Sequence, residues 1–369
     1  MQSNEVGIAL MVASNKAGRR RRSSPVPAKR SRACLALLGL CSGVLAPQAA
    51  PAKPRIVTLT FSHFLDGKSF FQKDLVEPWA KAIARDSGGR LQIRVINNSD
   101  PLGDVRAQAA NVKDGKVDIA LGIRGAEATR FPGTSVVEVP LAVRNARTGS
   151  RSLWRLYREG WLAKEYADYK VLAIFVQNPG LIHTIDRRIA TPDDMRSLRF
   201  RAPNAATANA LMTLGAQPSI LQFNEVMPRL DAGMLDGIIT NWGNPLPSFD
   251  TKIRFHTDVK FYTAAFFIVM NKRSYAALPA ALRVVIDRNS GRPWIDHIAS
   301  LWDRWDDDVR RRSLAQGQTI YTPDAAAMAQ WDAALRPAID TYLTGLAPQF
   351  RDARSLYQRF VSYERSERR

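Results

Sequence analysis

The chain of 369 residues has only two cysteines and four histidines. Both cysteines, Cys34 and Cys41, lie in the first fifty residues, so the rest of the chain can form no disulfide and no cysteine-based metal site. No two histidines have the spacing of paired zinc ligands; they are His63, His183, His256 and His297. We therefore expect no metal and no cofactor, and a fold that is held together by packing alone.

Catalytic signatures are also missing from the sequence. The stretch Asp66-Gly67-Lys68-Ser69 ends like a phosphate-binding loop, but Ser62 stands where that motif needs its first glycine. Neither G-x-G-x-x-G nor G-x-S-x-G occurs. The acidic run at residues 306–308 lies in a helical pattern and is interpreted as a solvated face. These absences argue against an enzyme and favour a protein that binds without chemistry.

The first fifty residues have the composition of a secretory signal peptide. A basic run that includes Arg19 to Arg22 precedes an apolar stretch, residues 33–46, and then a segment rich in small residues. The apolar stretch is too short for a membrane span, which needs about 20 residues. We expect residues 1–52 to be removed by cleavage after Ala52, which predicts export to the periplasm.

The formal net charge of +19 falls to +12 without residues 1–52, because that segment holds eight Lys or Arg residues and one Glu. The remaining basic residues are mostly scattered among acidic ones, and no helix-turn-helix, zinc-finger or RNA-binding signature accompanies them. We therefore expect no nucleic-acid partner, and we assign the charge to surface solvation and to attraction of anionic ligands. The remaining 317 residues exceed what one hydrophobic core usually holds, which predicts two lobes.

Short apolar strands alternate with helical patterns along the chain, which predicts an α/β fold with a parallel sheet. Apolar residues at four-residue spacing predict a helix from Phe71 to Ile83, interrupted or tightened at Pro78. Further helices are expected from Trp154 to Tyr166, after a cap at Asn224, and over residues 294–312 and 324–346, whereas the last twenty or so residues predict a loose helix or tail. The expected strands are residues 56–61, 91–96, 118–121, 171–176, 199–202, 236–240 and 266–271.

Ligands of open α/β sheets bind beyond the carboxyl ends of the strands. This rule nominates the polar residues that directly follow each predicted strand. They are Ser62 with His63, Arg124, the stretch near His183, Arg201 to Pro203, and Thr240 to Trp242.

From Phe61 onward the sequence resembles the substrate-binding proteins of tripartite ATP-independent periplasmic (TRAP) transporters, the DctP family. The resemblance covers roughly residues 56–345, and several motifs match in order and spacing. It implies a two-lobed receptor that closes over a small organic acid and delivers it to integral-membrane transporter subunits. The matching stretches are PWAKAIARDSGGRLQI, DGKVDIAL, RFPGTSVVEVP, TPDDMRSLRFRAP, NALMTLGAQPSILQFNEVMPRLDAGMLDGIITNW and FIVMNKRSYAALP.

The resemblance also implies roles for individual residues. The family's carboxylate-gripping arginine matches Arg201, whose planar guanidinium suits a carboxylate with two parallel hydrogen bonds. Phe223 matches an aromatic residue that packs against the ligand. Thr240, Asn241 and Trp242 follow the LDG stretch and complete the pocket, although many members carry an asparagine at the place of Thr240.

A second ligand-binding arginine of some members has no clean counterpart here. His183 occupies that neighbourhood and is expected to replace it, with a charge that depends on pH. His63 and Arg124 fall at further pocket positions of the family. Which acid is bound stays open, as does the presence of a bound cation.

The family likeness also implies lobes that are discontinuous in the sequence. We expect residues 53–175 with 267–305 in one lobe, 176–266 with 306–346 in the other, and residues 347–369 as a basic C-terminal tail. The long helix that starts near Trp294 should brace both lobes, and the protein should be a monomer. Two other functions stay open: a subunit that presents its ligand to a receptor kinase, and an enzyme that acts on a small carboxylate.

Overall fold

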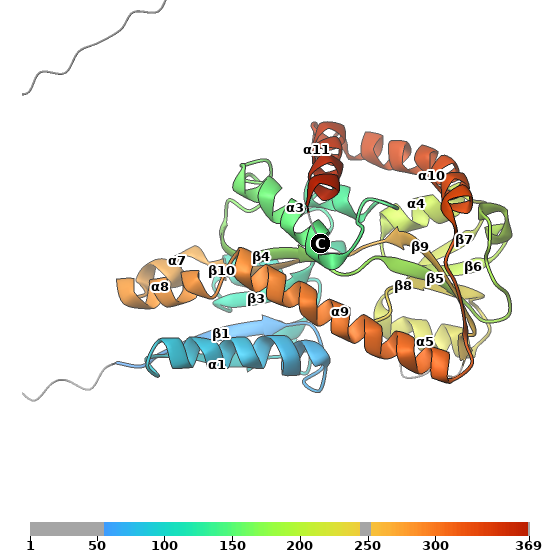
Figure 1. Ribbon diagram of the computed structural model, residues 1–369. Helices are drawn as coiled ribbons and strands as arrows, with labels where there is room; N and C mark the ends of the chain where they lie inside the picture. Colours follow the sequence, from blue (N-terminus) through green and yellow to red (C-terminus); the bar gives the residue numbers. More distant parts are fainter. Residues whose placement is uncertain (1–54, 244–251, 368–369) are drawn as a thin grey trace, which may run out of the picture. The chain divides into compact units, whose positions relative to one another are not determined.

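The computed structural model describes residues 55–243 and 252–367. The predicted signal peptide and its cleavage site lie outside these residues. Residues 53–369 form one compact unit with strands and helices in alternation (Figure 1). Two separate sheets lie inside this unit, so the predicted α/β class is confirmed.

Five strands form the first sheet, which we call sheet A, in the order β2-β1-β3-β10-β4. Strand β1 pairs in parallel with β2 and β3, whereas β10 runs antiparallel to β3 and β4. The parallel part comes from the strand–helix alternation at the start of the unit, because parallel neighbours need a crossover connection. The strands are β1 (Val57–His63), β2 (Leu91–Ile96), β3 (Ile119–Ile123), β4 (Tyr169–Val176) and β10 (Ala265–Asn271).

Six strands form the second sheet, sheet B, in the order β11-β9-β5-β8-β6-β7. Strand β6 pairs in parallel with β7 and β8, and β5 runs antiparallel to β8 and β9. The carboxyl ends of β6 and β8 therefore lie at the same edge of sheet B. The strands are β5 (Gly180–Thr184), β6 (Arg199–Ala202), β7 (Gln217–Ile220), β8 (Gly237–Thr240), β9 (Phe255–Tyr262) and β11 (Thr319–Tyr321).

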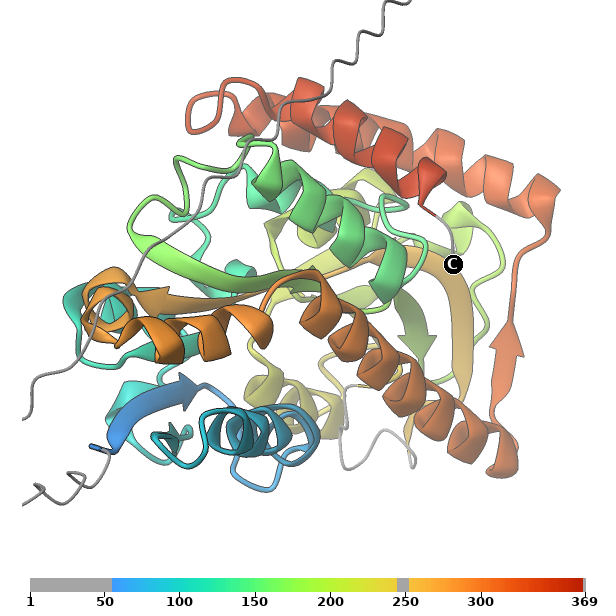
Figure 2. The same cartoon turned by 60° about the vertical axis from the view of Figure 1, so that its left-hand side comes forward.

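The chain passes between the two sheets after β4 and again between β9 and β10. The long helix α9 (Arg292–Ala315) runs along both sheets (Figures 1 and 2). It contacts β4 and α3 of the first sheet's layer, and its Val309 packs with Leu181 and Ile238 of sheet B. The exact limits of the two lobes stay a prediction.

The other helices cover the sheets. Helix α1 is preceded by a π-helical turn, Phe71–Val76, and Pro78 stands in the first turn of α1, where the backbone tightens from π to α geometry. Proline has no N–H to donate to the preceding turn, and the change from π to α geometry falls where that hydrogen bond is missing. The helices are α1 (Glu77–Asp86), α2 (Gln108–Asp114), α3 (Ala146–Arg158), α4 (Ala205–Thr213), α5 (Phe223–Asp231), α7 (Lys272–Ala277), α8 (Ala280–Arg288), α10 (Ala325–Leu346) and α11 (Ala353–Ser366).

Two predicted helix limits are wrong. The helix expected to run from Trp154 to Tyr166 ends at Arg158, and Gly160 follows with a φ of +89°, a conformation that ends helices because glycine adopts it without steric cost. The cap expected at Asn224 is instead made by Gln222, whose side chain and that of Glu225 form a reciprocal capping box.

The prediction of a loose C-terminal helix or tail is wrong as well. Helix α11 buries Leu356 and Phe360 completely, in one apolar cluster with residues of sheet A and α3. Its Glu364 accepts hydrogen bonds from the backbone N–H of Arg144 at 2.6 Å and from the hydroxyl of Thr148 at 2.8 Å. The segment is therefore part of the folded unit.

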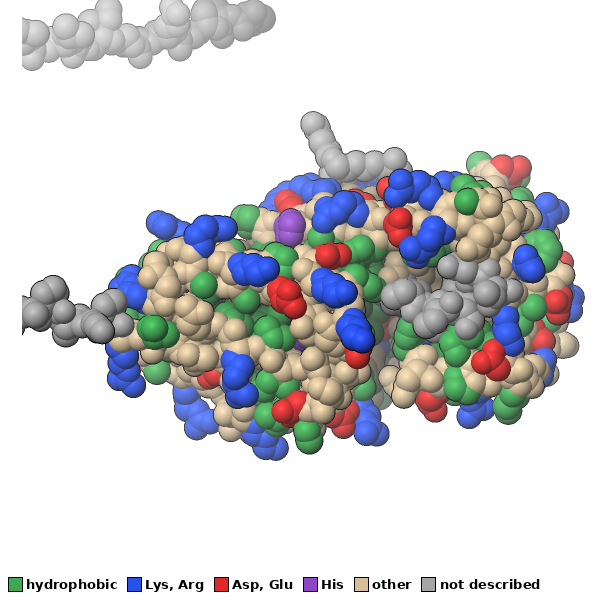
Figure 3. Space-filling view, turned by 90° about the horizontal axis from the view of Figure 1, so that it is seen from below, with side chains coloured by type: hydrophobic (Ala, Val, Ile, Leu, Met, Phe, Trp, Pro, Cys, Tyr) green, Lys and Arg blue, Asp and Glu red, His purple; other side chains and the backbone are tan. Residues whose placement is uncertain are grey.

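No helix in the described part of the chain is both long and apolar enough to cross a membrane. On the face drawn in Figure 3, Lys and Arg side chains are spread among Asp and Glu side chains and form no continuous basic patch.

Candidate ligand-binding site

Arg201 lies near the carboxyl end of β6 and is only 7% exposed. Two backbone carbonyls hold its guanidinium: Nε donates to the oxygen of Leu221 at 3.2 Å, and Nη1 donates to the oxygen of Ile239 at 3.0 Å. Both acceptors belong to the chain that flanks β6 in sheet B. The side chain is thus fixed by the sheet itself, before any ligand is present.

The charge of Arg201 has no acidic partner among the residues that the structure describes. Burial lowers the pKa of the guanidinium, and only the Tyr262 hydroxyl works in the opposite direction. A buried charge without a counter-ion is costly, because neither water nor an ion pair replaces its lost hydration. A buried guanidinium held in this way is suited to pair with an anionic ligand.

The sequence reasoning missed Tyr262, which lies beside Arg201, and Gln177, which bonds to Tyr262. Gln177 Nε2 donates to the Tyr262 hydroxyl at 2.7 Å, and both side chains are buried. A side chain at Gly180 would collide with the Tyr262 ring, since an added Cβ would lie 2.2 Å from Cε1. Both residues lie where the chain passes between the sheets, and a strand ending at Tyr262, had it been recognised, would have nominated that residue.

Thr240 ends β8, Asn241 and Trp242 follow it, and all three are buried. Asn241 Nδ2 donates to Asp306 Oδ1 of α9 at 3.0 Å, and the backbone N–H of Gly243 donates to the same oxygen. Asp306 is thus a buried acceptor, and its interpretation as a solvated residue is wrong. Burial raises the pKa of Asp306 to about 7, against the opposing effect of the hydrogen bonds from Gly243 and Asn241.

The side chain of His183 contacts residues of the two neighbouring strands of sheet B, β8 and β9. Its Nε2 lies 3.0 Å from the carbonyl oxygen of Thr240, and its Nδ1 lies 2.7 Å from Nδ1 of His256. The carbonyl can only accept, so Nε2 of His183 carries the proton. The ring of Trp242 packs against both histidines, with centroids 5.3 Å from His183 and 4.5 Å from His256. Any role of His183 in binding would therefore act through the positions of Thr240 and Trp242.

His256 is buried, and burial lowers its pKa to about 4, although a hydrogen bond with Gln318 works against this shift. The unfolded chain binds a proton near pH 6.5 and the folded chain only near pH 4, so stability falls as pH drops through this window. The expected contribution is on the order of 3 kcal/mol. We expect His256→Gln to reduce this acid destabilisation, measured as the difference from the unmutated protein in urea unfolding at pH 7 and pH 4.5.

The matched control for this prediction is His297→Gln. His297 is exposed on α9, and burial lowers its pKa less far than that of His256, so this variant should reduce the acid destabilisation less than His256→Gln. An acid destabilisation that His256→Gln leaves unchanged would contradict the assignment to His256.

The remaining predicted site residues occupy three different places. Phe223 begins α5, is half-buried and packs against an apolar cluster that includes Trp242. His63 ends β1, where Nε2 lies 3.1 Å from Oε1 of Gln72 and burial lowers the pKa of the ring. Arg124 follows β3 and forms a buried ion pair with Glu138.

Arg124 nevertheless lies near the strand end of Arg201. Glu138 Oε2, its ion-pair partner, also accepts a hydrogen bond at 3.1 Å from Asn204 Nδ2, and Asn204 caps α4 three residues after Arg201. Burial by itself would lower the pKa of Arg124, but Glu138, together with Tyr342 and Glu165, outweighs this effect and raises it. The Nε of Arg124 is buried with no hydrogen-bond partner in the described residues. The chain of polar contacts from Arg124 through Glu138 thus ends at Asn204, three residues after Arg201 in the sequence.

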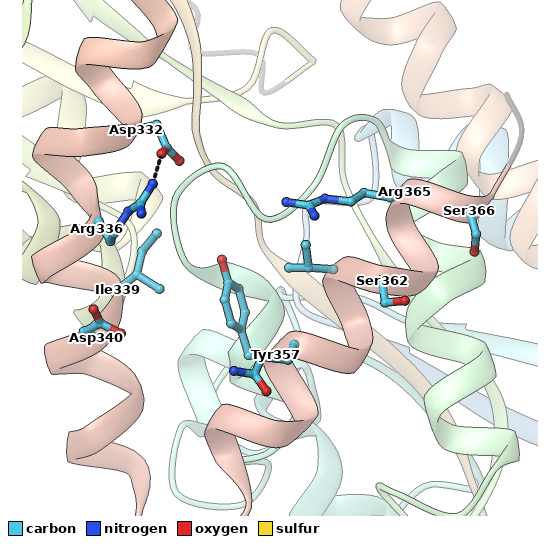
Figure 4. Close-up of a pocket in the computed structure, with 10 residues that line it drawn as sticks. Asp332, Arg336, Ile339, Asp340, Tyr357, Ser362, Arg365 and Ser366 are labelled. Carbon is cyan, nitrogen blue, oxygen red and sulfur yellow. Dashed lines mark hydrogen bonds and ion pairs between the residues drawn. The ribbon is translucent and has the colours of Figure 1, made fainter.

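A groove of about 820 Å³ lies elsewhere, between α10 and α11 (Figure 4). Three of its charged side chains pair with neighbours: Arg336 with Asp332, and Asp340 with Arg354. It contains none of the strand-end residues, so we do not assign it to ligand binding. Within the described residues, no group of three or more His, Cys, Asp or Glu side chains could hold a metal ion.

The sequence profile of the bacterial extracellular solute-binding proteins of family 7, DctP, matches residues 61–344. The chain belongs to this family. The predicted resemblance to TRAP substrate-binding proteins is thereby confirmed, and this family consists of solute receptors rather than enzymes. TRAP binding proteins of the DctP family are periplasmic and work with membrane subunits.

Two solved structures support the placement of this family 7 receptor. It is 31% identical to a TRAP solute-binding protein from Rhodoferax ferrireducens T118 in complex with copurified benzoate, with a TM-score of 0.77 over 84% of this chain and 98% of that one. It is 27% identical to a marine metagenome TRAP protein specific for aromatic acid ligands, bound to metahydroxyphenylacetate, with a TM-score of 0.79 over 85% and 100% of the two chains.

A further relative is the protein named outer membrane transporter protein TsaT from Comamonas testosteroni. It is 26% identical over 316 residues, which cover 82% of this chain and 91% of the relative.

Proposed function

We propose that this receptor binds a small aromatic carboxylate between its lobes and delivers it, chemically unchanged, to the membrane subunits of a TRAP transporter. It would act in the periplasm as a monomer, after removal of residues 1–52. One observation supports the proposal that the ligand is a carboxylate: the guanidinium of Arg201 is buried, is held by two carbonyls and has no acidic partner among the described residues.

The aromatic class has independent support. The solved relatives at 31% and 27% identity hold benzoate and metahydroxyphenylacetate. In this chain, aromatic side chains at the candidate site are suited to such a ring: Trp242 is buried beside the strand end, and Phe223 packs in the same cluster. Aromatic rings pack well against one another in addition to the area that they bury.

The proposed pocket combines a cation with apolar and polar walls. Arg201 would receive the carboxylate in a bidentate pair, which is strong and orienting where water is excluded. Phe223 and Trp242 would cover the ring. Thr240 and Asn241 would supply hydrogen bonds. His183, His63 and Arg124 would help to position the residues around the pocket through their contacts with Thr240, Gln72 and Glu138.

Benzoate should raise the melting temperature of the purified receptor. At a hundred-fold excess over Kd, ligand binding stabilises the folded state by about 2.7 kcal/mol. The uncharged control is benzyl alcohol, which has the ring but no carboxylate and should give no shift. A panel of benzoate, mandelate and succinate would compare aromatic with aliphatic acids. If succinate shifts the melting temperature and no aromatic acid does, the aromatic class is wrong; if no carboxylate does, the carboxylate role is wrong.

Analysis of the released ligand tests the proposal that the receptor does not change the acid chemically. A receptor releases the acid that it bound, so mass spectrometry of the released ligand should show an unchanged mass. A stoichiometric product of different mass would favour an enzyme instead.

A further inference from the structure

In the side-chain amide of Asn241, the nitrogen makes a hydrogen bond, whereas the oxygen makes none within the described residues. The side chain is completely buried, and its Nδ2 donates to Asp306 Oδ1 at 3.0 Å. Its Oδ1 is buried with no hydrogen-bond partner among the residues that the structure describes. Buried polar atoms are almost always paired, so an orphaned acceptor points to a donor that arrives with a ligand.

The orientation of this amide follows from its surroundings. Asp306 Oδ1 also receives the backbone N–H of Gly243, which can only donate. The carboxylate oxygen is therefore an acceptor on this side, and an exchanged amide would place one oxygen against another. Asp306 thus holds Nδ2 toward α9, and Oδ1 points away from Asp306.

Asn241 lies at the same strand end as the proposed anchor. It directly follows β8, and Arg201 Nη1 donates to the carbonyl of Ile239 in that strand. A small acid whose carboxylate is bound by Arg201 therefore lies at the edge of sheet B to which Asn241 belongs. At this edge, the Oδ1 of Asn241 can accept a hydrogen bond but cannot donate one.

We propose that Asn241 is a specificity-determining acceptor, positioned by Asp306, which selects aromatic acids that carry a hydrogen-bond donor, such as a ring hydroxyl, over acids that lack one. This inference rests on the proposed function, because it requires an acid on Arg201. A site whose buried acceptor stays unpaired discriminates strongly, since the unsatisfied group keeps its full desolvation cost. We expect a preference of about ten-fold or more.

Calorimetry with matched ligand pairs tests the proposal. The three hydroxybenzoates are compared with the three fluorobenzoates at the same ring positions, because fluorine has no proton to donate. At one ring position or more, the hydroxy acid should bind at least ten-fold tighter than its fluoro counterpart. Equal affinities at all three positions would overturn the proposal, while binding of the fluorobenzoates would still support a carboxylate receptor. If no aromatic acid binds, the proposed function itself fails.

Variants then assign the preference to the two residues. Asn241→Leu removes the acceptor and should bring the ratio of the two affinities to about one. Asp306→Leu removes the group that orients the amide and should reduce the ratio as well. Asp306→Asn keeps an acceptor oxygen for Asn241 and Gly243 and should restore most of the preference, a result that a merely structural role of the charge would not give.

The matched control is Asp307→Asn, on the exposed side of the same helix, which should leave the ratio unchanged. A ratio that persists in folded Asn241→Leu would overturn the role of Asn241. A ratio that persists in Asp306→Leu would overturn the positioning role of Asp306. If Asp306→Leu does not fold, the Asp306→Asn and Asn241→Leu measurements still decide, because loss of the preference in Asp306→Asn would contradict the rescue.

Discussion

Replacing Arg201 with methionine should lower the affinity for an aromatic acid at least a hundred-fold and leave the unliganded receptor as stable as before, or more stable. The loss follows because a buried, hydrogen-bonded charge pair across an interface is worth several kcal/mol when one partner is removed. The stability follows because Arg201 is buried without an acidic partner among the described residues, and a buried charge replaced by an apolar side chain of similar volume is often neutral or stabilising.

Isothermal titration calorimetry with benzoate and urea unfolding without ligand measure the two effects separately. Arg199→Met is the matched control, since Arg199 lies on the same strand but is exposed and forms its ion pair with Asp236 at 2.6 Å. It should leave affinity within about two-fold and stability within about 1 kcal/mol. Near-wild-type affinity in Arg201→Met would refute the carboxylate role of Arg201, as would an equal loss in Arg199→Met.

Arg201→Lys separates charge from shape. Lysine keeps the positive charge but lacks the planar fork that pairs with a carboxylate through two parallel hydrogen bonds. It also cannot reproduce both contacts to the carbonyls of Leu221 and Ile239 in the same geometry. We expect an affinity between those of the unmutated protein and Arg201→Met.

The place of Arg201 could be predicted from the sequence because its signals are local. A short strand is followed at once by Pro203 and by Asn204, a helix cap, and the structure has both the strand β6 and the cap at those residues. Strand ends, proline and capping residues each constrain only a few neighbours, so sequence patterns report them well. That no acidic side chain in the described residues pairs with Arg201 depends on which residues surround it in space, and no local pattern contains that information.

Asp306 shows the opposite case. Three consecutive aspartates on a helix read as a solvated face, and Asp307 and Asp308 are exposed. Asp306 is buried because α9 passes the end of β8, where Asn241 and Gly243 supply donors for its carboxylate. Those donors are more than sixty positions away in the chain, so only the tertiary structure can distinguish Asp306 from its neighbours.

Phe360→Ala should be among the most destabilising substitutions in this chain, although its segment was predicted to be a loose helix or tail. Phe360 is completely buried in the cluster that joins α11 to sheet A and α3. Truncation of a buried phenylalanine removes its apolar contacts and leaves a cavity, at a cost of about 3–5 kcal/mol. Urea unfolding followed by circular dichroism measures this loss as a lower midpoint at an unchanged slope.

The control is Ser355→Ala, an exposed position on the same helix, which should change stability by less than about 0.5 kcal/mol. A loss below about 1 kcal/mol in Phe360→Ala would show that α11 is only loosely attached. The sequence signal for its attachment is an apolar set at helical spacing, Leu356, Phe360 and Tyr363, within a basic stretch. The many charged residues around this set made its amphipathic face hard to recognise. One of them, the buried Glu364, bonds to Arg144 and Thr148 and so helps to attach the helix.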